Sequence, residues 1–185
     1  MSDAILVVGG CKSGKSARAL ELALATGAKD RIFVATCVAR DDEMDERVAR
    51  HQAERAGQWR TIEEPLDVAG VVRDNARPGT VILLDCLTLW VTNLLIEGRT
   101  KDDAVEEADR LADALEQAGG PVVVVSNEVG AGIVPENALA RAFRDAAGMV
   151  NQRIAQAAEK VVWCVAGIPV VVKENGRNMM DGSAG

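Results

Sequence analysis

The sequence predicts an α/β fold in which helices cover both faces of a mostly parallel β-sheet. Short apolar runs rich in β-branched residues alternate with longer amphipathic stretches, which is the order of elements in α/β proteins. The runs are apolar throughout instead of alternating in polarity, as is typical of strands buried on both faces. The last run follows the one before it too closely for a crossover helix, so we expect it to return antiparallel and to end the sheet in an edge hairpin.

We expect a strand at each apolar run, and the clearest runs are VILLD at 81–85 and VVVVS at 122–126. The predicted strands span residues 4–8, 31–36, 80–85, 121–126, 161–166 and 169–173. The amphipathic stretches between them predict helices at 15–27, 41–56, 66–75, 87–97, 101–118 and 137–159. The side chains expected in the core include those of Met149 and Trp163. Trp90 and Leu94, on one face of a predicted helix, are also expected there, and a subunit interface is their alternative.

Length and composition predict a single domain. The chain has 185 residues, and a typical domain has about 150. Because 48% of the residues are apolar, a core can form without disulfide bonds. We assign residues 1–173 to this single domain and expect residues 174–185, which have little apolar content, to form a flexible tail.

The charge balance argues against several classes of partner. Lys and Arg number 21 and Asp and Glu 28, so the formal net charge is −7 and a general nucleic-acid surface is not expected. No run approaches the length of about 18 apolar residues that a membrane span needs, and the first residues lack the basic flank of a signal peptide. We therefore expect no membrane insertion and a cytoplasmic location. The four cysteines lack metal-type spacing and are expected to be buried, reduced thiols.

Residues 9–16 read GGCKSGKS, which matches the phosphate-binding pattern GxxxxGK[ST] directly after a predicted strand and before a predicted helix. In such a P-loop, glycines let backbone N–H groups converge on phosphate oxygens at the positive end of the helix. Lys15 would neutralise charge on the β- and γ-phosphates, and Ser16 would offer a hydroxyl to Mg²⁺. The candidate nucleotide-binding residues are Gly9, Gly10, Cys11, Lys12, Ser13, Gly14, Lys15 and Ser16. The alternative is a glycine-rich turn with a solvated lysine.

A metal at this loop needs an acidic partner, which usually follows a buried strand in such folds. Asp85 ends the run VILLD and is the best candidate, and its alternative role is a helix cap.

A third polar group follows the predicted strand 121–126. Polar side chains at the carboxyl end of a parallel strand lie where open α/β sheets bind ligands, so we expect Glu128 in the cleft. Its alternative is a loop carboxylate that accepts hydrogen bonds from nearby backbone.

The chain has one histidine, His51, on a predicted helix rich in charged residues. Arg47, His51 and Arg55 follow one another at four-residue intervals, so they share a helix face. A neutral imidazole can attack phosphorus to form a phosphoramidate, and neighbouring arginines would stabilise the oxygens and lower the histidine pKa. A solvated surface histidine fits the same spacing, and the residues alone leave both interpretations open.

Taken together, these segments resemble the bifunctional adenosylcobinamide kinase / adenosylcobinamide-phosphate guanylyltransferase family of cobalamin biosynthesis. The likeness spans nearly the whole chain. It rests on GGCKSGKS at 9–16, DDEM at 41–44 before His51, WRT at 59–61, LTLWVTNLL at 87–95 and NEVGAGIVPENALARAFRDAAGMVNQRIA at 127–155. The last block is the longest and the most specific. One departure from the family is Lys12, because the family more often has Arg at this position. Lysine keeps the positive charge but cannot donate the two parallel hydrogen bonds to phosphate that an arginine side chain can.

The resemblance implies a RecA-like P-loop fold with three layers and two reactions on one substrate. The enzyme would phosphorylate adenosylcobinamide with ATP or GTP, and then transfer GMP from GTP to that phosphate to give adenosylcobinamide-GDP. The GMP would pass through His51, and Asp85 would serve Mg²⁺ or the guanine edge. A homo-oligomer, a trimer, is also implied. The alternatives are a P-loop small-molecule kinase without nucleotidyl transfer and a nucleotide switch without enzymatic activity.

Overall fold

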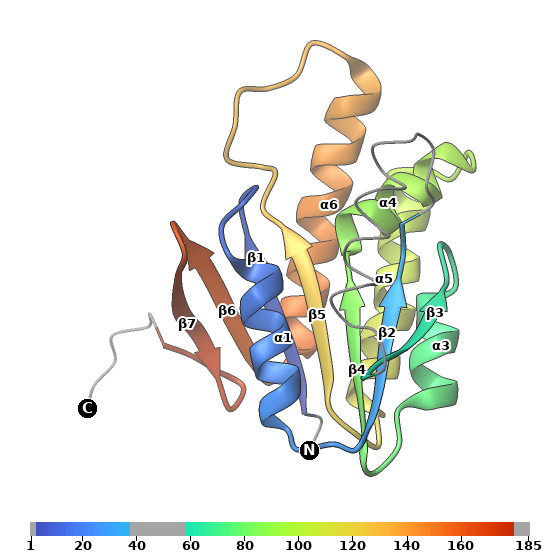
Figure 1. Ribbon diagram of the computed structural model, residues 1–185. Helices are drawn as coiled ribbons and strands as arrows, with labels where there is room; N and C mark the ends of the chain where they lie inside the picture. The colour runs from blue at the N-terminus through green and yellow to red at the C-terminus, as the bar shows by residue number, and fades with distance from the viewer. Residues whose placement is uncertain (1–2, 38–57, 180–185) are drawn as a thin grey trace.

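The computed structural model describes residues 3–37 and 58–179, and in this part of the chain it shows a sheet of eight strands with helices on both faces (Figure 1). The sheet order is β3-β2-β4-β5-β1-β6-β7-β8. The strands are β1 (Ala4–Gly9), β2 (Asp30–Ala35), β3 (Arg60–Glu63), β4 (Thr80–Asp85), β5 (Val122–Asn127), β6 (Lys160–Val165), β7 (Ile168–Glu174) and β8 (Arg177–Asn178). The helices are α1 (Lys15–Ala25), α3 (Val68–Asn75), α4 (Leu87–Ile96), α5 (Lys101–Glu116) and α6 (Ala138–Ala157).

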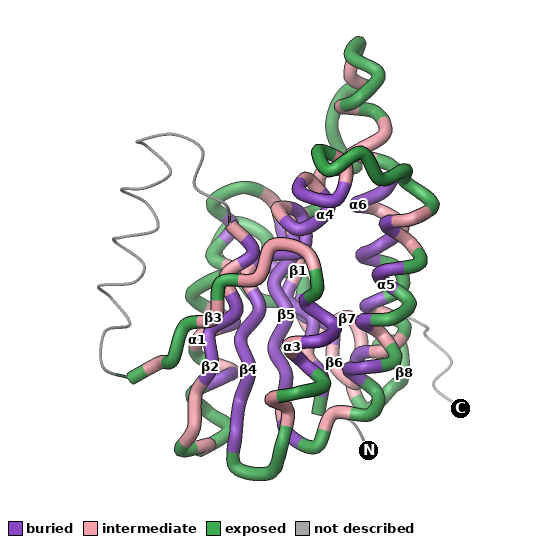
Figure 2. Tube along the Cα trace, turned by 90° about the vertical axis from the view of Figure 1, so that its right-hand side faces the viewer, coloured by how far each residue is buried: buried purple, intermediate pink, exposed green. Residues whose placement is uncertain are grey.

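The strands from β3 to β6 in this order pair in parallel, and β7 and β8 are antiparallel, so the predicted sheet and its edge hairpin are confirmed. In β4, Val81 and Leu83 pack into the core on the side of α1, whereas Ile82 and Leu84 pack on the side of α3, α4, α5 and α6. The continuously apolar runs therefore arise from burial on both faces, which Figure 2 shows along β4 and β5. No helix among the described residues has the length and apolar content to cross a bilayer.

Two segments carry more regular structure than the sequence predicts. The strand β3 is short and charged, with the sequence RTIE, and pairs in parallel with β2 at the edge of the sheet. No apolar run marks it, because only Ile62 of this edge strand is partly buried. The predicted tail from Glu174 is wrong at its start, because β7 extends to Glu174 and β8 follows it. An ion pair of 2.7 Å between Lys160 Nζ and Glu174 Oε1 holds this end of the chain against β6.

Expectations for single side chains have mixed outcomes. Trp90 and Leu94 are fully buried, as predicted. Trp163 is 45% exposed, because it lies on β6 beyond the area that the helices cover, so its assignment to the core is wrong.

All four cysteines are free thiols, and Cys86 and Cys164 are buried. Cys11 is exposed in the loop after β1, which corrects the prediction of burial for this residue. The predicted helix 41–56 lies outside the described residues.

The end of β1 lies so close to β6 that no side chain fits there. A Cβ atom on Gly9 would lie 2.6 Å from the carbonyl oxygen of Cys164 and 2.5 Å from Ser13 Oγ. A Cβ atom on Gly10, by contrast, would have no other atom within 4 Å. The two neighbouring glycines therefore form a matched pair for testing this contact.

We predict that Gly9→Ala lowers the free energy of unfolding by about 1–3 kcal/mol, because the β6 backbone or the loop has to shift. Gly10→Ala should stay within about 0.5 kcal/mol of the unchanged chain. Urea unfolding followed by circular dichroism measures both values. Equal stability of the two variants would show that β1 and β6 are not in this close contact.

Candidate functional site

The P-loop lies between β1 and α1, at the edge of the sheet where the parallel strands have their carboxyl ends (Figure 1). Gly14 has a left-handed backbone with φ 88° and is the residue before the first turn of α1. This conformation carries no penalty in glycine. The first turn of α1 contains no acidic residue, and no side chain caps it. Its N–H groups thus remain available to an anion at the positive end of the helix.

The turn between β6 and β7 supports the P-loop from one side. The N–H of Gly167 donates to the carbonyl oxygen of Ser13 at 3.1 Å. Gly14 also lies against this turn, since a Cβ atom there would be 3.4 Å from Gly167 Cα. The C-terminal hairpin therefore fixes the loop in addition to closing the sheet.

The two P-loop side chains with proposed roles lie at the start of α1. Lys15 Nζ donates to the carbonyl oxygen of Gly10 at 3.1 Å, so the side chain folds back across the loop. Ser16 is the second residue of the helix and is exposed. Both side chains are thus placed beside the backbone N–H groups that the sequence motif predicts to bind phosphate.

Asp85 ends β4 at the same edge of the sheet, and its neighbour Cys86 is buried. The N-cap position of α4 belongs to Cys86, which argues against the alternative of Asp85 as the cap. Burial raises the pKa of the Cys86 thiol, and the negative charge of Asp85 raises it further. Cys86 therefore stays neutral at physiological pH, and no thiolate adds negative charge beside the Asp85 carboxylate.

The end of β5 lies between β4 and the P-loop strand. Asn127 is in register with Gly9, and the N–H of Glu128 donates to the carbonyl oxygen of Gly9 at 3.2 Å. The Glu128 carboxylate is exposed and accepts a hydrogen bond of 3.0 Å from the N–H of Gly130. Glu128 is thus at the predicted edge of the sheet, and its carboxylate makes the local loop contact that was its alternative role.

A buried polar network behind this edge was not assigned a role from the sequence. Ser126 Oγ donates to Asn151 Oδ1 at 2.6 Å, and Asn151 Nδ2 donates to the carbonyl oxygen of Asn127 at 3.0 Å. Asn127 Nδ2 in turn donates to Thr88 Oγ1 at 3.3 Å. The network connects α6, β5 and α4 at the carboxyl end of β5. In the sequence, this network is indicated only by the polar residues Ser126 and Asn127 that follow the apolar run of β5.

The candidate residues Arg47, His51 and Arg55 lie outside the described residues. The chain that leads to them leaves the sheet at Thr36, whose N–H donates to the carbonyl oxygen of Asp85 at 3.4 Å. The segment with His51 thus begins at the same edge of the sheet as the P-loop. Within the described part of the chain, no three His, Cys, Asp or Glu side chains form a cluster that could hold a metal ion by themselves.

The chain is similar to known proteins over almost its full length. Residues 5–172 match the family model described as cobinamide kinase / cobinamide phosphate guanyltransferase. The bifunctional adenosylcobalamin biosynthesis protein CobP of Pseudomonas aeruginosa is 43% identical over 169 residues, which are 91% of this chain and 96% of that protein. CobU of Escherichia coli, a bifunctional adenosylcobalamin biosynthesis protein, is 42% identical over an alignment of 181 positions that covers 91% of this chain and 99% of that protein.

A solved structure supports the fold independently of the site. The structure of an ATPase domain superimposes with a TM-score of 0.51 at 10% identity, and the match covers 88% of this chain and 69% of that one. This similarity confirms the fold class alone. From the match over residues 5–172 and the relatives at 42–43% identity, the chain belongs to the cobinamide kinase / cobinamide phosphate guanyltransferase family.

Proposed function

We propose that this enzyme phosphorylates adenosylcobinamide with ATP or GTP and then transfers GMP from GTP to the new phosphate, which gives adenosylcobinamide-GDP. The observation that carries the proposal is the P-loop at the carboxyl edge of a parallel sheet, in a chain that belongs to a family described by both activities. A net charge of −7 requires the anionic ligands to be bound by local groups, and the loop and the start of α1 supply such groups.

In the kinase reaction, the backbone of the P-loop and Lys15 hold the phosphates of the nucleotide. The substrate hydroxyl oxygen forms a bond to the γ-phosphorus, the bond from that phosphorus to the bridging oxygen breaks, the nucleoside diphosphate leaves, and the hydroxyl proton is released. Ser16 and Asp85 would hold Mg²⁺, which would neutralise charge on the phosphates. A hydroxyl and one carboxylate fit this ion, which keeps several waters and binds phosphate oxygens as its other ligands.

In the guanylyl reaction, the imidazole of His51 forms a bond to the α-phosphorus of GTP, and pyrophosphate leaves. A phosphate oxygen of adenosylcobinamide phosphate then attacks the same phosphorus, and the bond to histidine breaks. In the first displacement the nucleophile is a neutral imidazole, so the anionic substrate phosphate does not have to attack the highly charged triphosphate. Arg47 and Arg55 would stabilise the charged oxygens during both displacements.

The wider setting of the reaction is also a proposal. The resemblance to the family supports a homotrimer. The acidic charge balance and the lack of a long apolar run support a cytoplasmic protein that neither binds nucleic acid nor inserts into a membrane. Asp85 serves Mg²⁺ in the kinase reaction in this scheme, and the guanine edge is its second candidate partner in the guanylyl reaction. Glu128, which directly follows β5 beside the P-loop strand, is the lower-ranked candidate for contact with a substrate at this edge.

We predict that His51→Asn abolishes covalent labelling by GTP labelled at the α-phosphorus, because asparagine offers no nucleophilic nitrogen. The bound label on the unchanged chain should be acid-labile and alkali-stable. Transfer of the γ-phosphate from ATP to adenosylcobinamide should continue in the variant. Label that persists in His51→Asn would reject this histidine as the nucleophile, and γ-transfer without any labelling of the unchanged chain would favour the kinase alternative.

We predict that Lys15→Ala lowers kcat/KM of both reactions by about 100-fold, because both nucleotides use the same phosphate cradle. Lys29, an exposed residue before β2, provides a control that removes the same charge away from the loop. Steady-state assays with labelled ATP and GTP measure both reactions. Loss of only one activity in Lys15→Ala would contradict a shared nucleotide site.

A further inference from the structure

Asn127, the last residue of β5, lies between the two proposed parts of the nucleotide site. Its Nδ2 donates to Thr88 Oγ1 at 3.3 Å, and Thr88 is in the first turn of α4, three residues after Asp85. The next residue, Glu128, donates its N–H to the carbonyl oxygen of Gly9, at the start of the P-loop. The end of β5 is therefore bonded both to the P-loop strand and to the helix that follows Asp85.

The alternation of side chains along the strands places Asn127 and Asp85 on the same face of the sheet. Val125 of β5 and Leu83 of β4 both pack into the core on the side of α1. Since side chains two residues apart on a strand share a face, Asn127 and Asp85 point to this side as well. The P-loop leads directly into α1, so these two polar side chains and the loop lie on one side of the sheet.

The helix α6 fixes the backbone of Asn127 from the other side of the sheet. Asn151 Nδ2 donates to the carbonyl oxygen of Asn127 at 3.0 Å, and Asn151 Oδ1 accepts from Ser126 Oγ at 2.6 Å. Ser126 and Asn151 are both buried. The end of β5 thus provides a fixed base from which the side chain of Asn127 reaches α4.

The amide of Asn127 is not explained by the stability of the strand. Its Oδ1 is shielded from solvent and has no hydrogen-bond partner among the described residues. A shielded acceptor without a donor is unfavourable, and an apolar side chain would extend the run VVVV of β5 without this cost. Such a conflict with a local rule is expected at functional sites. The contact with α4 is therefore the reason for an amide at this position.

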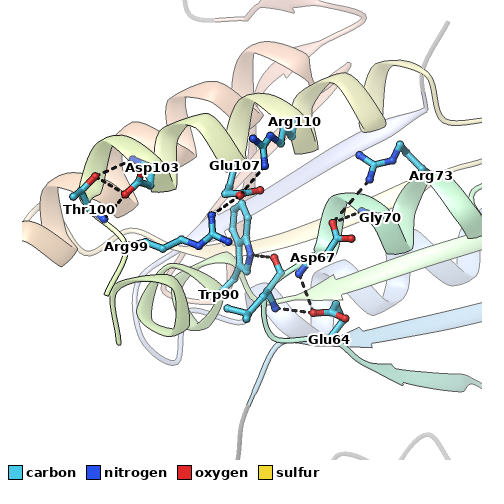
Figure 3. A network of polar contacts seen from close by, with 11 residues as sticks. Glu64, Asp67, Gly70, Arg73, Trp90, Arg99, Thr100, Asp103, Glu107 and Arg110 are labelled. Atoms are coloured by element: carbon cyan, nitrogen blue, oxygen red, sulfur yellow. Dashed lines mark hydrogen bonds and ion pairs between the residues drawn. The ribbon is translucent and has the colours of Figure 1, made fainter. Parts of the chain in front are cut away.

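Other buried contacts hold α4 against a different part of the sheet. Trp90 donates from Nε1 to the carbonyl oxygen of Leu66 at 2.7 Å (Figure 3). Asn93 donates from Nδ2 to the carbonyl oxygens of Thr36 at 2.7 Å and Pro65 at 3.2 Å. These partners follow β2 and β3, so the contacts fix α4 relative to that side of the sheet. The hydrogen bond from the end of β5 fixes the start of α4 relative to the strand between β4 and the P-loop strand.

We propose that Asn127 is a positioning residue for nucleotide binding, which holds Asp85 in place relative to the P-loop through the start of α4. The role rests on the proposed function, in which Asp85 and Ser16 hold Mg²⁺ on the phosphates. The backbone hydrogen bonds that support the loop do not involve the side chain of Asn127. Loss of the amide should therefore weaken the binding of ATP in the presence of Mg²⁺ and leave the binding of ATP alone almost unchanged.

The test measures ATP binding by isothermal titration calorimetry, once in Mg²⁺ and once in EDTA. Asn127→Val removes the amide, and Thr88→Val removes its partner. Thr92→Val is the matched control one turn further along α4, because Thr92 Oγ1 donates within the helix, to the carbonyl oxygen of Thr88 at 2.9 Å. Asn127→Val is also combined with Asp85→Asn. Urea unfolding followed by circular dichroism measures the stability of every variant.

Asn127→Val and Thr88→Val should raise the Kd of ATP in Mg²⁺ by at least about fivefold and change the Kd in EDTA by less than about twofold. Thr92→Val should match the unchanged chain. In the Asp85→Asn chain, Asn127→Val should change the Kd in Mg²⁺ by less than about twofold, because its effect passes through that carboxylate. The urea midpoint of Asn127→Val should equal or exceed that of the unchanged chain, which a purely structural role does not predict.

An unchanged Kd in Mg²⁺ for Asn127→Val would overturn the proposal, as would an equal rise of the Kd in Mg²⁺ and in EDTA. A loss in the Asp85→Asn chain as large as in the unchanged chain would overturn it too. The measurement contains no corrinoid, so its result does not depend on either transfer reaction. If the unchanged chain binds ATP no more tightly in Mg²⁺ than in EDTA, the metal role of Asp85 in the proposed function fails, which is distinct from a failure confined to Asn127.

Discussion

The close approach of β1 to its neighbouring strands determines where the candidate nucleotide site lies. Gly9 leaves no room for a side chain between the end of β1 and the backbone of β6. On the other side, its carbonyl oxygen accepts a hydrogen bond from Glu128, directly after β5. The loop that follows Gly9 is supported by Gly167, in the turn after β6. Three parallel strands and one hairpin thus hold the phosphate-binding backbone, and α1 begins from that fixed position.

The local electrostatics of this edge differ from those of the whole chain. The chain is acidic, and yet the loop presents N–H groups, the start of a helix and Lys15 in one place. At the end of β4 the negative charge belongs to Asp85, because the raised pKa keeps the neighbouring buried thiol of Cys86 neutral. A carboxylate at the same edge of the sheet as a phosphate cradle suits a cation that binds phosphate oxygens as well.

Local patterns were sufficient to predict most of the fold and the P-loop. The strands β4 and β5 are apolar on both faces, so their signal does not depend on any partner. The strand β3 gave no such signal, because it is short, charged and paired on one side only. Trp163 was misassigned because nothing in its own run of residues reveals that the helices stop short of the hairpin. The hydrogen bonds of Asn93 join residues that are far apart in sequence, so periodicity carries no information about them.

The helix α4 joins the end of β4 to the chain that follows β2 and β3. The helix begins two residues after Asp85, and its buried face carries both Trp90 and Asn93. Because an α-helix packed in a core moves as a unit, a displacement at the end of β4 would be passed to Thr36, Pro65 and Leu66 together. The end of β4, Thr36 directly after β2, and Pro65 and Leu66 after β3 therefore contact one rigid element. Asp85, which ends β4 just before this helix, is thereby held in a fixed relation to the ends of β2 and β3, as precise placement of a group beside a bound phosphate requires.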